Sequence, residues 1–215
     1  METTRNARQG RFITFEGTEG AGKTTQIRLL KEYLDSLNID ALVTREPGGT
    51  EVGEQVRSLL LQHTSLAMDA SSELLLMFAA RAQHLAQIIF PALRAGAWVI
   101  CDRFTDASYA YQGGGRGIPE AQIRAIECAV HENFQPDLTV LLTCAPETAM
   151  RRVGDRDEEK DRFESESAEF FRRVHAAYLK RVEQDRERFA VIDTEAKIED
   201  VAAAVRQAVA SRFSL

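Results

Sequence analysis

A glycine-rich segment near the N-terminus, GTEGAGKT at residues 17–24, has the spacing of a phosphate-binding loop. Glycines let backbone N–H groups turn inward and approach phosphate oxygens closely. Lys23 can reach the β- and γ-phosphates of a nucleotide, and the Thr24 hydroxyl can bind Mg²⁺. A glycine-rich turn with an incidental lysine is the alternative, but the segment lies between an expected strand and an expected helix, as the motif requires. The sequence therefore predicts a site for nucleotide phosphates.

This loop does not specify a reaction, because GTPase switches, motor ATPases and kinases share it. The N-K-x-D motif with which GTPases read guanine is absent from the sequence, and 215 residues are short for the larger ATPases. Other residues must therefore recognise a second substrate, if there is one. A nucleotide-dependent switch without an acceptor remains the alternative from a different class.

Charged residues follow two expected strands directly. Arg45 comes after the strand at 41–44, and Asp102 and Arg103 come after the apolar run at 97–101. Because ligands of open α/β sheets bind beyond the carboxyl ends of the strands, we expect these side chains near the phosphate loop. Arginine can hold a phosphate with two parallel hydrogen bonds, and a strand-terminal aspartate can support Mg²⁺. A structural ion pair is the alternative for both arginines.

Two further features concern arginines. Arg81 interrupts an otherwise apolar helix, where an unpaired charge is costly, so it either reaches the surface or meets a ligand. With Arg45 and Arg103 it would form a site for a second anion, as phosphoryl transfer to a phosphate acceptor requires.

The charged run at 151–162 is either a solvated loop or a lid whose arginines close over the triphosphate.

The elements that must position these residues alternate along the chain. Strands are expected at 11–16, 41–44, 97–101, 137–143 and 189–192; helices are expected at 21–37, 51–62, 69–90, after Pro119, at 146–153, around 170–182 and at 198–209. A glycine-rich loop is expected at 113–117. This alternation predicts an α/β fold with a mainly parallel sheet. The helix at 69–90 is apolar on nearly every side from Leu74 to Ala80, so it is either deeply buried or packed on a partner chain.

Composition limits the class of protein. The 215 residues, 44% of them apolar, fit one domain, expected at 11–215 after a flexible arm at 1–10. The net charge of -6 argues against a partner that is a nucleic-acid polymer, since such a partner requires a basic face. Three cysteines without CxxC spacing predict no disulfide framework. The N-terminus lacks the apolar core of a secretory signal, and polar residues interrupt the longest apolar stretch, 74–93, so we expect a cytoplasmic protein without a membrane partner.

Taken together, the motifs resemble those of the bacterial thymidylate kinases, P-loop nucleoside monophosphate kinases, from about Arg11 onward. The resemblance rests on the phosphate loop and on TREPGGT at 44–50, FAAR at 78–81, DRF at 102–104, YQGGGRG at 111–117 and DRFE at 161–164. It implies a three-layer fold with a mainly parallel sheet of about five strands. It also implies transfer of the ATP γ-phosphoryl group to dTMP, giving dTDP and ADP, with Mg²⁺, by a homodimer. Another small nucleotide or nucleoside kinase with a different base pocket is the alternative.

The resemblance also implies roles for individual residues. Arg45 and Arg103 match ligands of the dTMP phosphate, and Arg81 matches the arginine facing the thymine carbonyl. The expected ATP-binding residues are Gly17, Thr18, Glu19, Gly20, Ala21, Gly22, Lys23, Thr24 and Thr25. The expected dTMP-binding residues are Glu16, Arg45, Pro47, Met77, Phe78, Arg81, Arg103, Ser108, Tyr111 and Gln112. The metal would be held by Thr24 and Asp102, and the catalytic residues would be Lys23, Arg103, Arg156 and Glu16. Ser108 and Gln112 match positions that hydrogen-bond the base. Tyr111 matches the aromatic residue under the deoxyribose, which disfavours substrates with a 2′-hydroxyl. Glu16 matches the carboxylate near the sugar 3′-hydroxyl and the metal.

The sequence departs from the family at two places. The base-stacking Phe of many members lies four residues before the thymine-facing arginine, where this chain has Met77; Phe78 is about 100° further round a helix, so either side chain could cover the base. The segment expected to be the lid, about 151–165, is one residue longer and more acidic than usual, through Asp157, Glu158 and Glu159. Glu19 resembles the subgroup whose catalytic arginine comes from the lid; Arg151, Arg156 and Arg162 are candidates, and we favour Arg156.

Overall fold

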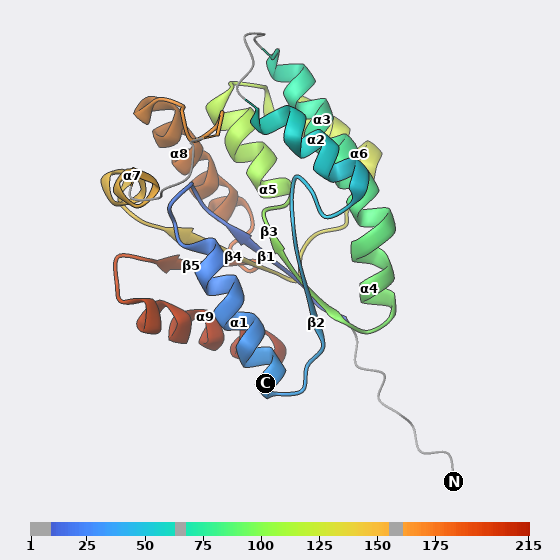
Figure 1. Cartoon of the computed structure of the whole chain (residues 1–215), viewed down its shortest axis with the longest axis vertical. Coiled ribbons are helices and arrows are strands. Elements are labelled where there is room, and N and C mark those ends of the chain that lie inside the picture. The colour runs from blue at the N-terminus through green and yellow to red at the C-terminus, as the bar shows by residue number, and fades with distance from the viewer. Residues whose placement is uncertain (1–9, 63–67, 155–160) are drawn as a thin grey trace.

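Five parallel strands form the central sheet in the part of the chain that this computed structural model describes, residues 10–62, 68–154 and 161–215 (Figure 1). The strands are β1 (Phe12–Glu16), β2 (Ala41–Arg45), β3 (Trp98–Asp102), β4 (Leu138–Thr143) and β5 (Phe189–Asp193), in the order β2-β3-β1-β4-β5. All neighbouring strands run parallel. The predicted strands and the predicted α/β fold with a parallel sheet are confirmed. The expected N-terminal arm lies almost wholly outside the described residues.

The inner strands of the sheet are buried on both sides, as continuous apolar runs predict. All five residues of the central strand β1 are buried. On one face, α1 (Lys23–Ser36) and α9 (Ile198–Phe213) cover Ile13 and Phe15. Further residues of the same cluster include Leu34, from α1. The opposite face carries further apolar clusters, which include Phe12, Val99 and Leu141, and also the polar groups that lead to the cavity described below.

Helices of the opposite layer cover the other face of the sheet (Figure 1). They are α2 (Glu51–Leu61), α3 (Ala70–His84), α4 (Phe90–Arg94), α5 (Thr105–Ser108), α6 (Glu120–His131), α7 (Pro146–Gly154) and α8 (Ala168–Gln184), with two π-helical segments, η1 (Leu85–Ile89) and η2 (Tyr109–Gly115). Aromatic side chains of α8, including Phe170 and Tyr178, pack with Tyr111 of η2 and Leu141 of β4. Loops between these helices and strands therefore surround one end of the sheet.

The long apolar helix extends further than the sequence predicts. Asp69 caps α3 by accepting hydrogen bonds from the N–H groups of Ser71 and Ser72. The helical path then continues through η1 into α4 instead of ending before Pro91. Pro91 lies in the first turn of α4, directly after the widened π turn, where a missing N–H is tolerated. The expected end of this helix was therefore wrong.

The path Ala70–Arg94 is long and apolar enough, by length and composition, to cross a bilayer. It is nevertheless a core helix of this fold, because it carries Glu73, Arg81 and His84, all buried and all bonded to other elements. Such charged groups are costly in hydrocarbon and are satisfied here within the protein.

The glycine-rich segment is helical where the sequence predicts a loop. Residues 105–115 form α5 and η2, and Gly113, Gly114 and Gly115 belong to the last turn of η2. A Cβ atom on Gly114 would lie 2.6 Å from the Cβ of Ala177 and 2.8 Å from the carbonyl oxygen of Arg173. The glycines therefore permit close approach of η2 to α8, and this packing overrides their tendency to form a loop.

Candidate active site

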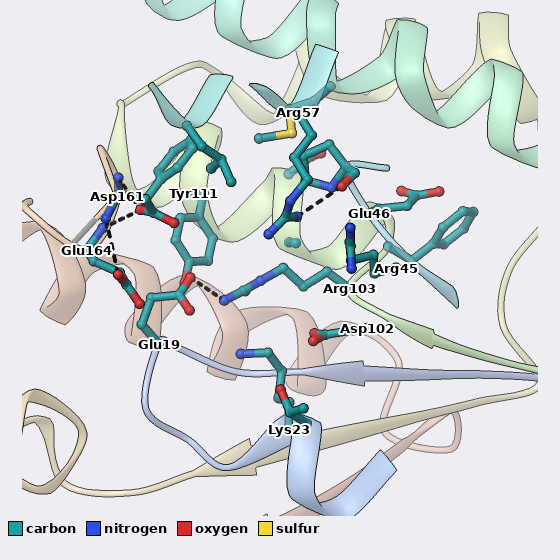
Figure 2. A pocket seen from close by; sticks show the side chains of 18 of the residues that line it. Glu19, Lys23, Arg45, Glu46, Arg57, Asp102, Arg103, Tyr111, Asp161 and Glu164 are labelled. Carbon is teal, nitrogen blue, oxygen red and sulfur yellow. Dashed lines mark hydrogen bonds and ion pairs between the residues drawn. The ribbon is translucent and has the colours of Figure 1, made fainter. Parts of the chain in front are cut away.

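A cavity of about 440 Å³ opens at the carboxyl ends of the strands (Figure 2). Of the residues expected at the site, fifteen line it: Glu19, Gly20, Gly22, Lys23, Thr24, Thr25, Arg45, Pro47, Met77, Arg81, Asp102, Arg103, Ser108, Tyr111 and Gln112. The remaining lining residues are Glu46, Arg57, Leu61, Phe104, Ala107, Asp161, Phe163 and Glu164. Residues from distant parts of the chain therefore converge where the parallel sheet places its ligand site.

The phosphate loop connects β1 to α1 along one wall of this cavity. Gly22 is the N-cap of α1 with φ 90°, a left-handed conformation that glycine adopts without steric cost. The Lys23 ammonium donates to the carbonyl oxygens of Gly17 (3.2 Å) and Thr18 (3.0 Å). Burial, with Arg103 nearby, lowers the pKa of Lys23. The helix N-terminus and the lysine together give this wall a positive potential suited to anions.

Arg103 lies opposite the loop at the end of β3. Its guanidinium donates to the Gly17 carbonyl oxygen (2.9 Å) and the Tyr178 hydroxyl (3.2 Å), and it pairs with Glu19 at 2.6 Å. It also lies over the Tyr111 ring, 4.7 Å from the centroid. Burial opposes the positive charge, but Glu19 outweighs this effect, so the pKa of Arg103 is raised well above its ordinary value. Arg103 is thus a fixed cation between the phosphate loop and the aromatic wall.

Two more arginines face the cavity from the β2 side. Arg45 pairs with Glu54 at 3.0 Å and is about half exposed. Arg57 of α2 donates to the Pro47 carbonyl oxygen at 3.0 Å and points into the cavity from the side opposite Lys23 (Figure 2). Burial, with Arg45 beside it, lowers the pKa of Arg57. The sequence analysis missed Arg57, because a charged residue in an amphipathic helix gives no signal that separates a site from a solvated face.

Arg81 closes the far end of the cavity and is buried, not a surface residue. Its Nε donates to Glu46 at 2.7 Å, and its two terminal nitrogens donate to the Ser108 hydroxyl (3.1 Å) and the Phe104 carbonyl oxygen (3.0 Å). The second Glu46 oxygen lies 3.0 Å from Nδ1 of His84. Each arginine nitrogen is therefore held, and the guanidinium has a fixed orientation toward the cavity.

Met77 and Phe78 have different surroundings. Met77 lines the cavity, whereas the Phe78 ring is buried in the core beside Leu74 and Ile123. The Arg81 guanidinium lies over that ring, 4.5 Å from its centroid. The expected contact between Phe78 and a substrate is therefore not available in this structure. The physical reason is the helical period: one residue step turns the ring from the cavity into the core.

Glu16 also differs from expectation, since its side chain does not line the cavity. The carboxylate accepts hydrogen bonds from the Phe104 N–H (2.7 Å) and the Tyr178 hydroxyl (2.8 Å) and is fully buried. Tyr178 also accepts a hydrogen bond from Arg103, so Glu16 positions this arginine through Tyr178 and does not itself touch a ligand. Gly17, Thr18 and Ala21, expected at the nucleotide, likewise do not line the cavity; the first two turn their carbonyl oxygens toward Lys23.

The buried Glu16 predicts a pH-dependent stability. Burial, followed by the nearby Asp106 charge, raises the pKa of Glu16 from its ordinary 4.5. The folded protein therefore binds more protons than the unfolded chain between pH 4.5 and the raised pKa, so this group's contribution to stability falls as pH rises. Glu16→Gln is expected to gain stability relative to wild type from pH 5 to pH 8, by about 1.4 kcal/mol per unit of pKa shift.

Urea unfolding at several pH values measures this difference. Glu32→Gln, on the exposed face of α1, is the control and should change stability little throughout. A difference between Glu16→Gln and wild type that is constant with pH would show that the buried carboxyl does not take up a proton.

The donor set beside Lys23 fits a magnesium ion. Oδ1 of Asp102 is buried without a hydrogen-bond partner, and Asp102 and Thr24 both line the cavity. In the described residues there is no cluster of three or more His, Cys, Asp or Glu side chains that would form an all-protein metal cage. Mg²⁺ is usually held by one or two carboxylates together with substrate phosphates and water, so this small set is sufficient.

The segment expected to be the lid is only partly described. Arg151 is exposed, and Arg152 binds the Thr194 carbonyl oxygen at 2.7 Å. Arg162 donates to the Leu60 carbonyl oxygen (2.8 Å) and pairs with Glu73 at 2.7 Å. Arg156 and the acidic residues at 157–159 lie outside the described residues. Of the candidate arginines, Arg162 is therefore engaged at the far end of the cavity.

Known proteins share this sequence and arrangement. The family model for thymidylate kinase matches residues 15–205. The thymidylate kinase of Chromohalobacter salexigens is 50% identical over 206 residues, which cover 95% of this chain and 97% of that protein. The thymidylate kinase of Hahella chejuensis is 49% identical, with 96% and 99% covered. The crystal structure of thymidylate kinase from Ehrlichia chaffeensis superposes with a TM-score of 0.77 at 34% identity, covering 94% of this chain and 99% of that one.

Proposed function

The chain belongs to the thymidylate kinase family, and from that membership we propose how its cavity performs phosphorylation of dTMP. The enzyme transfers a phosphoryl group from ATP to dTMP and gives dTDP, a step toward dTTP. In this proposal, residues 11–215 act as one kinase domain, with a lid at about 151–165. The observation that carries the proposal is that a phosphate loop and several arginines face one cavity.

The donor phosphates bind at the loop wall. Backbone N–H groups of loop residues that line the cavity, such as Gly20 and Gly22, and the N-terminus of α1 hold the oxygens, and Lys23 leaves the Gly17 and Thr18 carbonyl oxygens for the β- and γ-phosphates. Thr24 and Asp102 would hold Mg²⁺, which neutralises charge on the phosphate oxygens when bound. The loop and Lys23 thereby orient the γ-phosphoryl group toward the opposite wall.

The acceptor binds between Arg103 and Arg81. Arg103 and Arg45 hold its phosphate in line with the donor, while Arg81, Ser108 and Gln112 contact the base. Tyr111 lies under the sugar and leaves no room for a 2′-hydroxyl, and Met77 covers the base in place of Phe78. Phosphoryl transfer depends mainly on positioning and on neutralising charge, so no strong general base is required. Closure of the lid excludes water that would otherwise hydrolyse ATP.

An ADP-release assay across acceptors tests the function. With ATP and Mg²⁺, dTMP is expected to be the best substrate among dTMP, dUMP, dCMP, dGMP and thymidine. Thymidine is the informative control, because it keeps the base but lacks the phosphate that Arg103 binds. Preference for another monophosphate would indicate a different base pocket, and slow ATP hydrolysis unaffected by dTMP would indicate a nucleotide switch.

The exposed apolar face of α2 and α3 supports a homodimer. These helices pack side by side (Figure 1), and their outer surface exposes Val52 (48%), Leu59 (48%) and Leu75 (56%). Alanines at 79 and 82 extend the face along α3. Exposed apolar surface of this kind is typical of protein interfaces. An interface at this face would explain why α3 is apolar on sides that the monomer does not bury.

Leu75→Glu is expected to dissociate the dimer at micromolar concentration, because it places a charge in the apolar interface. Sedimentation velocity measures the change from a dimer to a 24.0 kDa monomer. Leu42→Glu, on the exposed edge strand β2, is the matched control and should remain dimeric. A wild-type mass of one chain would contradict the dimer.

We place the enzyme in the cytoplasm. Cys101, Cys128 and Cys144 are all free, as expected for a reducing compartment. The net charge of -6 argues against a nucleic-acid polymer as partner but not against mononucleotide substrates, which a few placed cations hold.

A further inference from the structure

One buried carboxylate lies behind the base end of the cavity. Glu73, in the first turn of α3, is fully buried, and its oxygens are bound from three directions. Oε1 accepts from Nε2 of Gln112 at 2.8 Å, Nε of Arg116 lies 3.1–3.2 Å from both oxygens, and a terminal nitrogen of Arg162 lies 2.7 Å from Oε2. Glu73 does not line the cavity, so it acts only through these neighbours.

The bond to Gln112 determines which end of that amide faces the cavity. A carboxylate held by two guanidinium groups can only accept hydrogen bonds, so it selects the NH₂ group of Gln112 and excludes its carbonyl oxygen. Gln112 itself lines the cavity. With the nitrogen directed to Glu73, the carbonyl oxygen is the polar atom of Gln112 that remains for a ligand.

The neighbouring groups have the opposite polarity. Arg81 is a pure donor, and Ser108, which accepts from Arg81, keeps its own proton to donate. A base that presents a carbonyl oxygen beside an N–H matches donors at Arg81 and Ser108 next to an acceptor at Gln112. Thymine has this pattern at O4 and N3, whereas cytosine has an amino group and an unprotonated N3.

We propose that Glu73 is a positioning residue for base selection: it fixes the Gln112 amide so that its oxygen accepts the N3–H of thymine and rejects cytosine. This inference rests on the proposed base contacts of Gln112. Arg162, which belongs to the proposed lid segment at about 151–165, shares the carboxylate that orients Gln112.

The variant Glu73→Gln tests the inference with little change of volume. The carbonyl oxygen of the new glutamine at position 73 is expected to stay with the guanidinium groups, so its NH₂ group faces Gln112. The Gln112 amide must then rotate, which turns its carbonyl oxygen toward position 73 and its NH₂ group toward the cavity. The kcat/KM values for dTMP and dUMP, which share N3–H, should then fall together by roughly 10- to 100-fold, the effect of an unmet hydrogen bond. The dCMP value should stay constant or rise, and the KM for ATP should not change.

Glu127→Gln is the matched control. Glu127 is a buried carboxylate of α6 that also accepts from a glutamine amide, Nε2 of Gln135 at 2.6 Å, but it does not line the cavity. This variant should leave the ratio of dTMP to dCMP activity unchanged. A general loss of stability would lower activity on all three acceptors equally and would not change the ratio.

A reciprocal exchange tests the mechanism further. In Glu73→Gln/Gln112→Glu, the NH₂ group of the new glutamine faces a carboxylate, so an acceptor again faces the cavity and most of the dTMP preference should return. Gln112→Glu alone places two carboxylates face to face and should lose at least as much dTMP activity as Gln112→Leu; this comparison holds even if Glu73→Gln does not fold. Loss of selectivity in Gln112→Leu but not in a folded Glu73→Gln would overturn the role of Glu73. Unchanged dTMP kinetics in Gln112→Leu would instead refute the base contact that underlies it.

Discussion

Arg103→Ala is expected to lower kcat/KM for dTMP by on the order of 10³-fold, the largest loss among the described arginines. The side chain is 14% exposed, is bonded to the phosphate loop and lies over Tyr111, so in the proposed complex it presents a preorganised cation to the acceptor phosphate. Its removal also takes away the positive charge that pairs with Glu19 at 2.6 Å on the same wall. The acceptor phosphate then loses the attraction of the Arg103 guanidinium and is repelled by the Glu19 carboxylate.

Steady-state kinetics with dTMP and ATP varied separately measure this loss. Arg45→Ala is the control, because its half-exposed ion pair with Glu54 makes it a weaker phosphate ligand and a smaller loss is expected. Combining Arg103→Ala with Glu19→Gln should recover part of the dTMP affinity, since it removes the repulsion. A loss of only a few-fold in Arg103→Ala would place the acceptor phosphate elsewhere.

Arg156→Ala is expected to lower kcat by up to about 10³-fold while ATP still binds, as for arginine fingers that act on the transferred group. This prediction rests on the family resemblance and on the bonds that hold Arg162, another candidate, to Leu60 and Glu73. Single-turnover phosphoryl transfer measures the chemical step, and a nucleotide-binding titration measures ATP affinity.

The other lid arginines supply distinct controls. Arg162→Ala should raise the KM for dTMP more than it lowers kcat, because Arg162 binds Glu73 behind the base. Arg151→Ala should change kcat little if Arg156 is the catalytic arginine. A near-normal kcat in Arg156→Ala together with a severe loss in Arg151→Ala would move the catalytic role to Arg151.

Much of the fold follows from local patterns in the sequence. Buried parallel strands such as β3 and β4 appear as short continuous apolar runs, so their position could be predicted within about a residue. The loop at 17–24 could be predicted because phosphate binding requires glycines and a lysine at fixed spacing. Placement of Arg45 and Arg103 followed from the rule that ligands bind beyond the carboxyl ends of parallel strands.

The features that were missed depend on contacts between distant segments. The helical form of Gly113–Gly115 results from packing against α8, which follows more than 50 residues later. The burial of Glu16 depends on Tyr178 and Phe104, and the orientation of Arg57 depends on the Pro47 carbonyl oxygen. No local pattern encodes these contacts, so the neighbours of a site residue could not be deduced even where its identity could.

The position of β1 in the sheet has a consequence for motion. β1 is hydrogen-bonded on both sides, to β3 and β4, whereas β2, which carries Arg45, is an edge strand bonded only to β3. Central strands open only when the whole domain unfolds, while edges open in smaller fluctuations. The phosphate loop and Arg103, which follow the inner strands β1 and β3, are thus anchored to the slowest-opening part of the sheet, whereas Arg45 is carried by an edge strand. Local opening at the β2 edge is therefore expected to withdraw Arg45 from the acceptor while the phosphate loop keeps its position.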